Sequence, residues 1–243
     1  MIALIPTKGR PKTSTYKLLS ASGFTVYHFV EPQDYENYDV PNKVNIMAND
    51  QGMTFVRNFM LDFSVQNGFK DVLVCDDDVN SFGEAKNKRA KNLPNAQAII
   101  KPYEIFQAAQ FALGGFNQRQ FAWSEAKSYR VNTGKVNGCF LMKPELISWR
   151  YKHNTKEDID FIMQCLDNRR NFIFFGRIFY NTPAIGSNAG GLHEMYKAKR
   201  DTEWARKVAL DWPEYSKIIE QYGRTDVRLN YKKKALDMGL QVI

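Results

Sequence analysis

Cysteine and histidine are scarce in this sequence, which has three of each among 243 residues. Cys75, Cys139 and Cys165 lie in apolar segments and lack the spacing of metal ligands. Because their number is odd and their contexts are apolar, we expect buried, reduced thiols rather than a disulfide framework. This cysteine usage is typical of a cytoplasmic protein.

The sequence also lacks an apolar run long enough to cross a bilayer. Its first residues, Met1-Ile-Ala-Leu-Ile-Pro6, are typical of a strand and leave no room for a signal peptide. It contains no internal repeat, low-complexity segment or clear linker. We therefore expect one domain over residues 1–243, located in the cytoplasm and not attached to a membrane.

The composition indicates a folded protein with a basic surface. Hydrophobic residues make up 44% of the chain and aromatic residues 14%, which excludes general disorder. The formal net charge is +8. This charge permits a polyanionic partner, but many basic proteins bind no nucleic acid.

The first third of the chain alternates between predicted strands and helices. Short β-branched or apolar runs predict strands at Ile2–Pro6, Thr25–Val30 and Val72–Cys75, and helical spacing predicts helices at Ser14–Ala21 and Met53–Val65. This order predicts an α/β fold with a mostly parallel central sheet flanked by helices. In such sheets, ligands gather outside the carboxyl ends of the strands.

The later elements follow less regular patterns. We expect a polar, basic loop over Ser81–Asn95, either a solvated excursion or a lid that contacts substrate. The spacing predicts a helix over Tyr103–Phe116 that ends at a glycine pair, strands over Gly138–Met142 and Asn171–Tyr180, and a helical, basic carboxy-terminal segment.

Three consecutive carboxylates, Asp76, Asp77 and Asp78, directly follow the apolar run Val72–Cys75. Hard oxygen ligands suit Mg²⁺ or Mn²⁺, and such an ion commonly combines one or two protein carboxylates with substrate phosphates. Asp76 and Asp78 have the Asp-x-Asp spacing. A solvated acidic turn is the alternative, but the position directly after a buried strand favours a metal site.

A second acidic group, Glu157-Asp-Ile-Asp160, lies at a predicted helix start. Thr155 and Asp158 match a capping pattern, so Asp158 is either a cap or a general base that deprotonates an acceptor hydroxyl. The sequence favours neither interpretation over the other.

The carboxy-terminal part contains a glycine-rich turn and a basic segment. Asn188 can bind a sugar hydroxyl or cap the turn, and Gly190 and Gly191 permit close backbone approach to a ligand. Four cations in the segment that follows either contact a DNA backbone or form a solvated face: Lys197, Arg200, Arg206 and Lys207.

Four aromatic residues among basic neighbours can stack on bases or pack in the core: Trp123, Tyr129, Trp149 and Tyr151. We expect His28 to be structural and His153 to lie at the surface.

The ordered set of motifs resembles GT-A-type glycosyltransferases and, more narrowly, the TET-associated glycosyltransferase family of bacteriophages. The matching segments span roughly residues 2 to 215: Ile5-Pro-Thr-Lys-Gly-Arg-Pro11, Gly52-Met-Thr-Phe-Val-Arg-Asn58, Asp76-Asp-Asp78, Glu157-Asp-Ile-Asp-Phe161 and Ser187-Asn-Ala-Gly-Gly191. The narrower resemblance depends mainly on the last segment and on the basic helix and Trp212-Pro213 after it.

The resemblance implies roles for particular residues. Residues 1–80 would form the nucleotide-sugar-binding half, with Pro6, Thr7, Arg10 and Glu31 at the nucleotide and Arg57 at the diphosphate. Residues 81–243 would form the acceptor-binding half, with Asp158 as the base. His193 matches the late histidine that many GT-A enzymes use as a further metal ligand, and Asp77 would assist Asp76 and Asp78.

We therefore expect a metal-dependent glycosyltransferase, with inversion favoured. It would move a sugar from a nucleotide-sugar, a UDP-sugar in the first instance, to the 5-hydroxymethyl group of a modified pyrimidine in double-stranded phage DNA. The location would then be the cytoplasm of the infected host cell. Two alternatives are a glycosyltransferase for a polysaccharide or small molecule, and a non-catalytic DNA-binding α/β protein.

Overall fold

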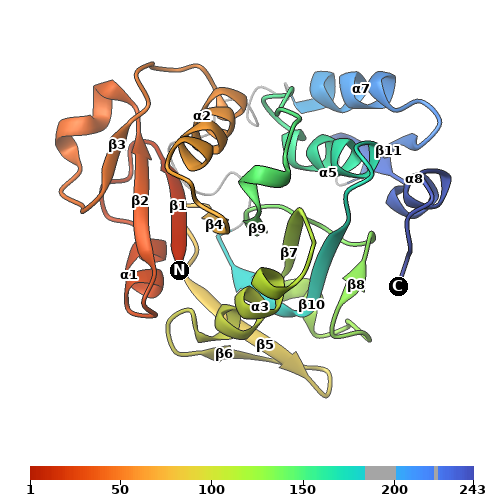
Figure 1. Ribbon diagram of the computed structural model, residues 1–243, viewed down its shortest axis with the longest axis horizontal. Coiled ribbons are helices and arrows are strands. Elements are labelled where there is room, and N and C mark those ends of the chain that lie inside the picture. Colours follow the sequence, from red (N-terminus) through yellow and green to blue (C-terminus); the bar gives the residue numbers. More distant parts are fainter. Residues whose placement is uncertain (184–200, 222–223) are drawn as a thin grey trace.

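A ten-stranded mixed sheet forms the centre of the computed structural model, which describes residues 1–183, 201–221 and 224–243 (Figure 1). The strand order is β3-β2-β1-β4-β9-β7-β10-β5-β6, and β8 pairs with β10 beside this path. The strands are β1 (Ile2–Thr7), β2 (Thr25–Val30), β3 (Lys43–Asn45), β4 (Val72–Cys75), β5 (Ser81–Lys86), β6 (Arg89–Leu93), β7 (Leu113–Gln118), β8 (Arg130–Val131), β9 (Cys139–Met142) and β10 (Phe172–Asn181).

Helices cover both faces of this sheet and continue into the carboxy-terminal part. They are α1 (Ser14–Ser20), α2 (Met53–Gln66), α3 (Gln97–Ala108), α4 (Arg119–Ala122), α5 (Glu157–Asp167), α7 (Asp201–Asp211) and α8 (Tyr231–Asp237), with 3₁₀ turns at Pro32–Asn37 and Pro144–Leu146. A separate two-stranded sheet joins β11 (Ser216–Gln221) to β12 (Arg224–Leu229).

Alternating side chains of the central strands build two hydrophobic cores. Leu4 of β1 and Val74 of β4 pack into one core with α2 and α5. Ile5 and Leu73, their neighbours along the same strands, pack into the other core with α1 and α3. Because successive strand residues point to opposite faces, both faces must be covered. The predicted α/β fold with a mostly parallel central sheet is confirmed.

The parallel register brings the predicted ligand-binding loops to one edge. Strand β1 pairs in parallel with β2 and with β4, with Leu4 opposite both Tyr27 and Val74. The loop after β1, Glu31 after β2 and the acid triplet after β4 therefore all leave the sheet at its carboxyl edge. The prediction that these three segments meet at the carboxyl edge of the sheet is confirmed.

Two predicted elements differ from the structure. Residues 81–95 are not a loop, because β5 and β6 pair antiparallel around a two-residue turn at Asn87 and Lys88. The predicted helix over 103–116 is right only at its start: α3 ends at Ala108, and β7 runs through Gly114 and Gly115. A Cβ on Gly115 would lie 1.8 Å from the Lys135 carbonyl oxygen, so glycine serves here for close backbone approach.

The carboxy-terminal part is only partly helical. Helix α7 packs on the β11–β12 hairpin through Ala205, Val208 and Val227, and α8 packs against α5. The chain end returns to the main sheet, where Val131 and Ile243 exchange backbone hydrogen bonds of 3.2 and 3.3 Å. The hairpin between the two helices was not predicted.

The three cysteines are free and buried, as expected. Among the described residues, no helix has the length and apolarity needed to cross a membrane.

Candidate active site

The turn after β4 presents the acid triplet at the carboxyl edge of the sheet. Thr15 of α1 holds this turn, because its hydroxyl donates to the Asp76 carbonyl at 2.7 Å and accepts from the Val79 N–H at 2.9 Å. On the other flank, the Asp76 N–H donates to the Gly138 carbonyl at 2.7 Å. The Thr15 side chain and the Gly138 backbone thus hold the turn that carries the three carboxylates.

The three aspartates differ in exposure. The side chain of Asp77 is only 7% exposed and accepts hydrogen bonds from Thr7 Oγ1 at 2.8 Å and from Arg10 Nη1 at 2.6 Å. The side chains of Asp76 and Asp78 are 37% and 26% exposed. Asp77 therefore anchors the loop after β1, while its two neighbours face outward.

Tyr38 completes the anchor of that loop, although no local sequence pattern indicates this role. Its hydroxyl lies 2.9 Å from Thr7 Oγ1 and accepts from the Arg10 N–H at 2.8 Å. Burial raises the pKa of Tyr38, against the effect of its hydrogen bonds with Thr7 and Arg10. The phenol therefore stays neutral and can both donate and accept in this network.

Arg57 extends from α2 toward the acid triplet. Its Nη2 lies 3.1 Å from Asp76 Oδ1, and its guanidinium carbon lies 5.2 Å from the centre of the Phe140 ring. Burial opposes the charged form, but Asp76, Tyr151, Glu157 and Asp158 together raise the pKa of Arg57. Its Nε and Nη1 are buried and have no hydrogen-bond partner within the described part of the chain. A buried cation with unused donors is well suited to an anionic ligand.

Helix α5 brings Glu157 and Asp158 to the same site. Burial first, and then the charge of Asp158, raises the pKa of Glu157 to about 8, while Arg57 opposes the shift. Burial also raises the pKa of Asp158, against its backbone N–H contacts and Lys156. The two carboxylates are tightly coupled, and the pair holds a proton more strongly than free carboxylates do.

The capping box suggested by Thr155 and Asp158 does not form at the start of this helix. The residue at the N-cap is Lys156, at a φ of 64°, and it makes no side-chain capping bond. The hydroxyl of Thr155 is buried and has no hydrogen-bond partner among the residues that the structure describes. The Ser/Thr-x-x-acid pattern is therefore present in the sequence but does not form the capping box.

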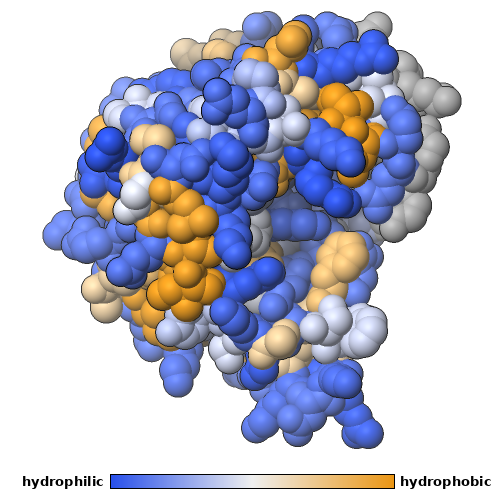
Figure 2. Space-filling view, turned by 90° about the vertical axis from the view of Figure 1, so that its right-hand side faces the viewer, coloured by the Kyte–Doolittle hydropathy of each residue, from blue (hydrophilic) through white to orange (hydrophobic). Residues whose placement is uncertain are grey.

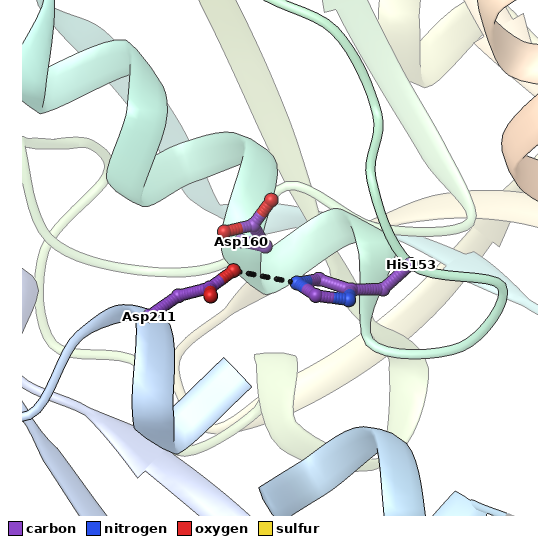
Figure 3. Close-up of side chains that lie close together, drawn as sticks. All are labelled: His153, Asp160 and Asp211. Carbon is purple, nitrogen blue, oxygen red and sulfur yellow. Dashed lines mark hydrogen bonds and ion pairs between the residues drawn. The ribbon is translucent and has the colours of Figure 1, made fainter. Parts of the chain in front are cut away.

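Asp160 lies further along α5 and is fully buried. Its carboxylate accepts from Trp212 Nε1 and from Gln164 Nε2, each at 2.7 Å. His153 Nε2 lies 3.0 Å from Asp211 Oδ2 beside it, as Figure 3 shows. His153 is buried, so its expected surface position is wrong.

His153, Asp160 and Asp211 each place a potential metal-ligand atom within 4.8 Å of the other two. Both oxygens of Asp160 already accept hydrogen bonds, and the cluster joins α5 to α7. Its contacts are those of a structural link between two helices.

The charges at the site fit a divalent cation. Five carboxylates, those of Asp76, Asp77, Asp78, Glu157 and Asp158, lie near the two guanidinium groups of Arg10 and Arg57. Burial and the other carboxylates raise the pKa of Asp76 to about 6 despite Arg57. A divalent ion on outward-facing oxygens would relieve this repulsion.

The loops after β1 and β2 form a polar network beside the triplet. Glu31 is buried and lies 2.9 Å from Lys8 Nζ and 2.6 Å from Gln33 Nε2. Lys8 also pairs with Asp50, and the Gly9 N–H donates to Asp34 at 2.8 Å. Pro6 and Thr7 end β1 within the sheet, next to this network. Lys8 was not among the predicted nucleotide-binding residues.

The remaining predicted site residues divide into two groups. Asn188, Gly190, Gly191, His193, Lys197 and Arg200 lie outside the described residues. Arg206 and Lys207 lie on α7, where Lys207 pairs with Glu203 at 2.8 Å and covers the Trp204 ring at 4.1 Å. That ion pair is typical of a solvated helix face.

Comparison with known proteins gives one match by sequence. A model of the family described as TET-Associated Glycosyltransferase matches residues 1–191. No curated protein sequence matches the chain.

Solved structures with a similar arrangement are distant. A197 from STIV is 13% identical, over 74% of this chain and 83% of that chain, with a TM-score of 0.46. A CMP:2-keto-3-deoxy-manno-octonic acid synthetase complexed with CTP is 10% identical, over 88% and 98%, with a TM-score of 0.46. The glycosyltransferase GlyE from Streptococcus pneumoniae TIGR4 is 12% identical, over 87% and 63%, with a TM-score of 0.39. These values support no functional argument.

The family match covers well over half of the chain and includes the acid triplet, both arginines and the start of α5. The chain therefore belongs to the TET-associated glycosyltransferase family and is a glycosyltransferase.

Proposed function

We propose that this glycosyltransferase moves a sugar from a nucleotide-sugar, a UDP-sugar in the first instance, to the 5-hydroxymethyl group of a modified pyrimidine in double-stranded DNA. The observation that carries the proposal is the meeting of Asp76, Asp78, Arg57 and Asp158 at one edge of the sheet. The donor class is supported by the cationic and hydrogen-bonding groups there, and the acceptor class by the family to which the chain belongs.

Donor binding would use the groups after β1, β2 and β4. Asp76 and Asp78 would hold Mg²⁺ or Mn²⁺, which supplies positive charge to the diphosphate oxygens when bound. Arg57, whose Nη2 lies beside Asp76, and Arg10 would add two guanidinium groups near the diphosphate. Glu31, Thr7 and Pro6 would line the nucleotide side.

The transfer step would use Asp158 as the general base. Its carboxylate accepts the proton of the acceptor hydroxyl, and the hydroxyl oxygen bonds to the anomeric carbon. The bond from that carbon to the diphosphate oxygen breaks, and the diphosphate leaves with the electron pair. This direct displacement inverts the anomeric carbon. The raised pKa of the Glu157–Asp158 pair supports proton acceptance near neutral pH.

Glu157, Asp158 and Asp160 are the three candidates for the general base. Asp160 is fully buried and bonded through both oxygens, so it is poorly placed to reach a substrate. Glu157 holds its proton to a higher pH than an ordinary carboxyl group does. Asp158 is thus the best candidate.

Mass spectrometry of nucleosides from hydroxymethylated duplex DNA, treated with the protein and a panel of nucleotide-sugars, tests this proposal. A mass increase of one sugar residue on the hydroxymethylated pyrimidine supports it. If the duplex stays unmodified while a saccharide receives the sugar, the acceptor is a saccharide and not DNA. If no nucleotide-sugar is turned over at all, the enzymatic role is contradicted.

A further inference from the structure

The β5–β6 hairpin projects from the sheet as a basic ribbon. Its four cationic side chains, Lys86, Lys88, Arg89 and Lys91, are all exposed. The hairpin forms the lowest part of the molecule in Figure 1, and the lowest part of the surface in Figure 2 is almost uniformly hydrophilic. None of the four makes an ion pair with any residue in the described ranges, while Glu84 lies across the ladder from Lys91.

Phe82 anchors the base of the hairpin in the core, and a small apolar contact holds its outer part. Ala85 and Ala90 pack against Ala122 of α4 and Phe179 of β10. A Cβ on Gly83 would meet the Phe179 ring at 2.4 Å and the Lys91 carbonyl oxygen at 2.2 Å, so the ribbon lies very close to β10. This packing gives the exposed charges a fixed position relative to the sheet.

The turn places a cation at the tip of the ribbon. Asn87 and Lys88 have φ angles of 52° and 58°, which is the two-residue turn that matches strand twist. Glycine is the usual second residue of such a turn, because a side chain there is strained. Lysine at this position therefore lowers the stability of the turn and adds a positive charge at the tip of the ribbon.

Helix α4 adds an open aromatic surface next to this ribbon. The Trp123 side chain is 51% exposed, and its Nε1 donates to the Gln120 carbonyl at 2.9 Å, which fixes the ring. A shallow, open groove of about 420 Å³ lies between the two elements and is lined by Lys88, Ala90, Arg119, Gln120, Trp123 and Asn181. Cations along a groove bind a phosphate backbone, and a fixed exposed indole can stack on a base that has left the duplex.

The groove is connected to the acid triplet by a short segment. Only Val79 and Asn80 separate Asp78 from β5, and Asn181 at the groove donates to Asn80 Oδ1 at 2.7 Å. Six residues of β5 at about 3.3 Å each place the tip roughly 20 Å from the strand start. A phosphate backbone on the ribbon would therefore lead from the tip toward the site.

We propose that the β5–β6 hairpin and the Trp123 face of α4 bind the DNA acceptor, with the cations on its phosphates and the indole against a base or sugar. This inference deepens the proposed function and rests on it. It also moves the main DNA contact away from the carboxy-terminal basic segment. Basic side chains on β6 also protect an edge strand from pairing with another chain, but that role needs neither Arg119 nor an exposed indole.

The test compares four variants of the full chain in DNA binding, DNA glycosylation and nucleotide-sugar hydrolysis. The hairpin variant replaces Lys86, Lys88, Arg89 and Lys91 by glutamine. The second variant is Trp123→Ala, with Trp123→Phe to restore an aromatic ring. The matched control removes the same number of exposed positive charges elsewhere, at Lys17, Lys70, Arg169 and Arg170. All of these side chains are exposed, so the fold is expected to persist, and thermal unfolding verifies it.

We expect the hairpin variant to bind DNA at least tenfold more weakly, with a log–log salt slope that is shallower by about one for each phosphate it no longer binds. Trp123→Ala should weaken binding by roughly tenfold without changing the salt slope, and Trp123→Phe should restore most of it. Hydrolysis of the nucleotide-sugar should stay unchanged in all variants. DNA binding of the hairpin variant equal to that of the control would overturn the inference while the proposed function stands. A wild-type protein that neither binds nor modifies DNA would overturn both.

Discussion

Glu157 and Asp158 are adjacent carboxylates at the start of α5, and neither is fully solvated. Burial and the charge of Asp158 raise the pKa of Glu157 from 4.5 to about 8. The folded protein therefore binds this proton more tightly than the unfolded chain does. The stabilisation of the fold by this bound proton is complete below about pH 4.5 and is lost as the pH rises through about 8.

Glu157→Gln should remove this pH dependence and raise the free energy of unfolding above pH 8 by on the order of a few kcal/mol. Urea unfolding of the metal-free protein at both ends of this pH range measures the effect. Glu36→Gln, at an exposed position, is the control and should change nothing. An unchanged pH dependence in Glu157→Gln would show that Glu157 is ionised in the folded state at neutral pH.

At the next residue, Asp158→Asn separates a base from a structural acid. The amide keeps the size and most hydrogen bonds of the carboxylate but cannot accept the hydroxyl proton. We expect turnover to fall by roughly 10²–10⁴-fold, with unchanged or increased stability. A rate equal to that of the wild type would assign the proton transfer to Glu157.

The acid triplet allows a comparison of three adjacent aspartates. Asp76→Asn and Asp78→Asn should each abolish transfer, because each loses a proposed metal ligand. Asp78→Asn should leave the melting temperature nearly unchanged, whereas Asp76→Asn also removes the charge partner of buried Arg57. Asp77→Asn should instead lower the melting temperature, because it weakens the bonds to Thr7 and Arg10. The exposed Asp39→Asn is the control. Activity retained in both outer variants would place the metal elsewhere.

At the scale of the elements, the amino-terminal half was predictable because its signals are local. Short apolar runs ending in polar loops predicted β1, β2 and β4, and their alternation with helices required parallel pairing. Parallel pairing then placed Arg10, Glu31 and the acid triplet on one edge without further information. The outward direction of Asp76 and Asp78 depends on Thr15 and Gly138, which no local pattern indicates.

The later elements were less predictable because tertiary contacts decide them. The segment around Gly114 and Gly115 looks like a helix end, but it is a central strand in close contact with the backbone near Lys135. The polar segment after the triplet has no apolar period, yet it pairs as a hairpin because β10 offers it an edge. Composition alone predicts a loop in the second case.

The glycine pair in β7 provides a test of that explanation. Gly115→Ala places a Cβ 1.8 Å from the Lys135 carbonyl oxygen, so the backbone must move. We expect the free energy of unfolding to fall by about 1–3 kcal/mol, the usual cost of overpacking. Gly114→Ala meets the Phe106 ring at 3.0 Å, and this side chain can shift, so the loss should be smaller. Thermal unfolding of both variants measures the difference; equal losses would contradict the close-approach argument.

At the scale of the whole molecule, donor chemistry and acceptor binding should respond to different conditions. Excess EDTA should stop both nucleotide-sugar hydrolysis and DNA transfer, because both need the proposed metal. Added monovalent salt should weaken DNA transfer strongly and hydrolysis only slightly, because phosphate contacts of the acceptor depend on counterion release. Full activity in excess EDTA would contradict the metal mechanism.

The turn that carries the acid triplet is tied on one flank to Thr15 of α1 and on the other to Gly138 before β9. It cannot be displaced without disturbing both neighbours. The β5–β6 hairpin begins three residues after the triplet. Its base is held by β10 and by Phe82 in the core, and its outer part by a few alanines. The donor site should therefore tolerate insertions and substitutions in the hairpin. We expect a change of acceptor to require fewer compensating changes in this ribbon than in the turn that carries the acid triplet.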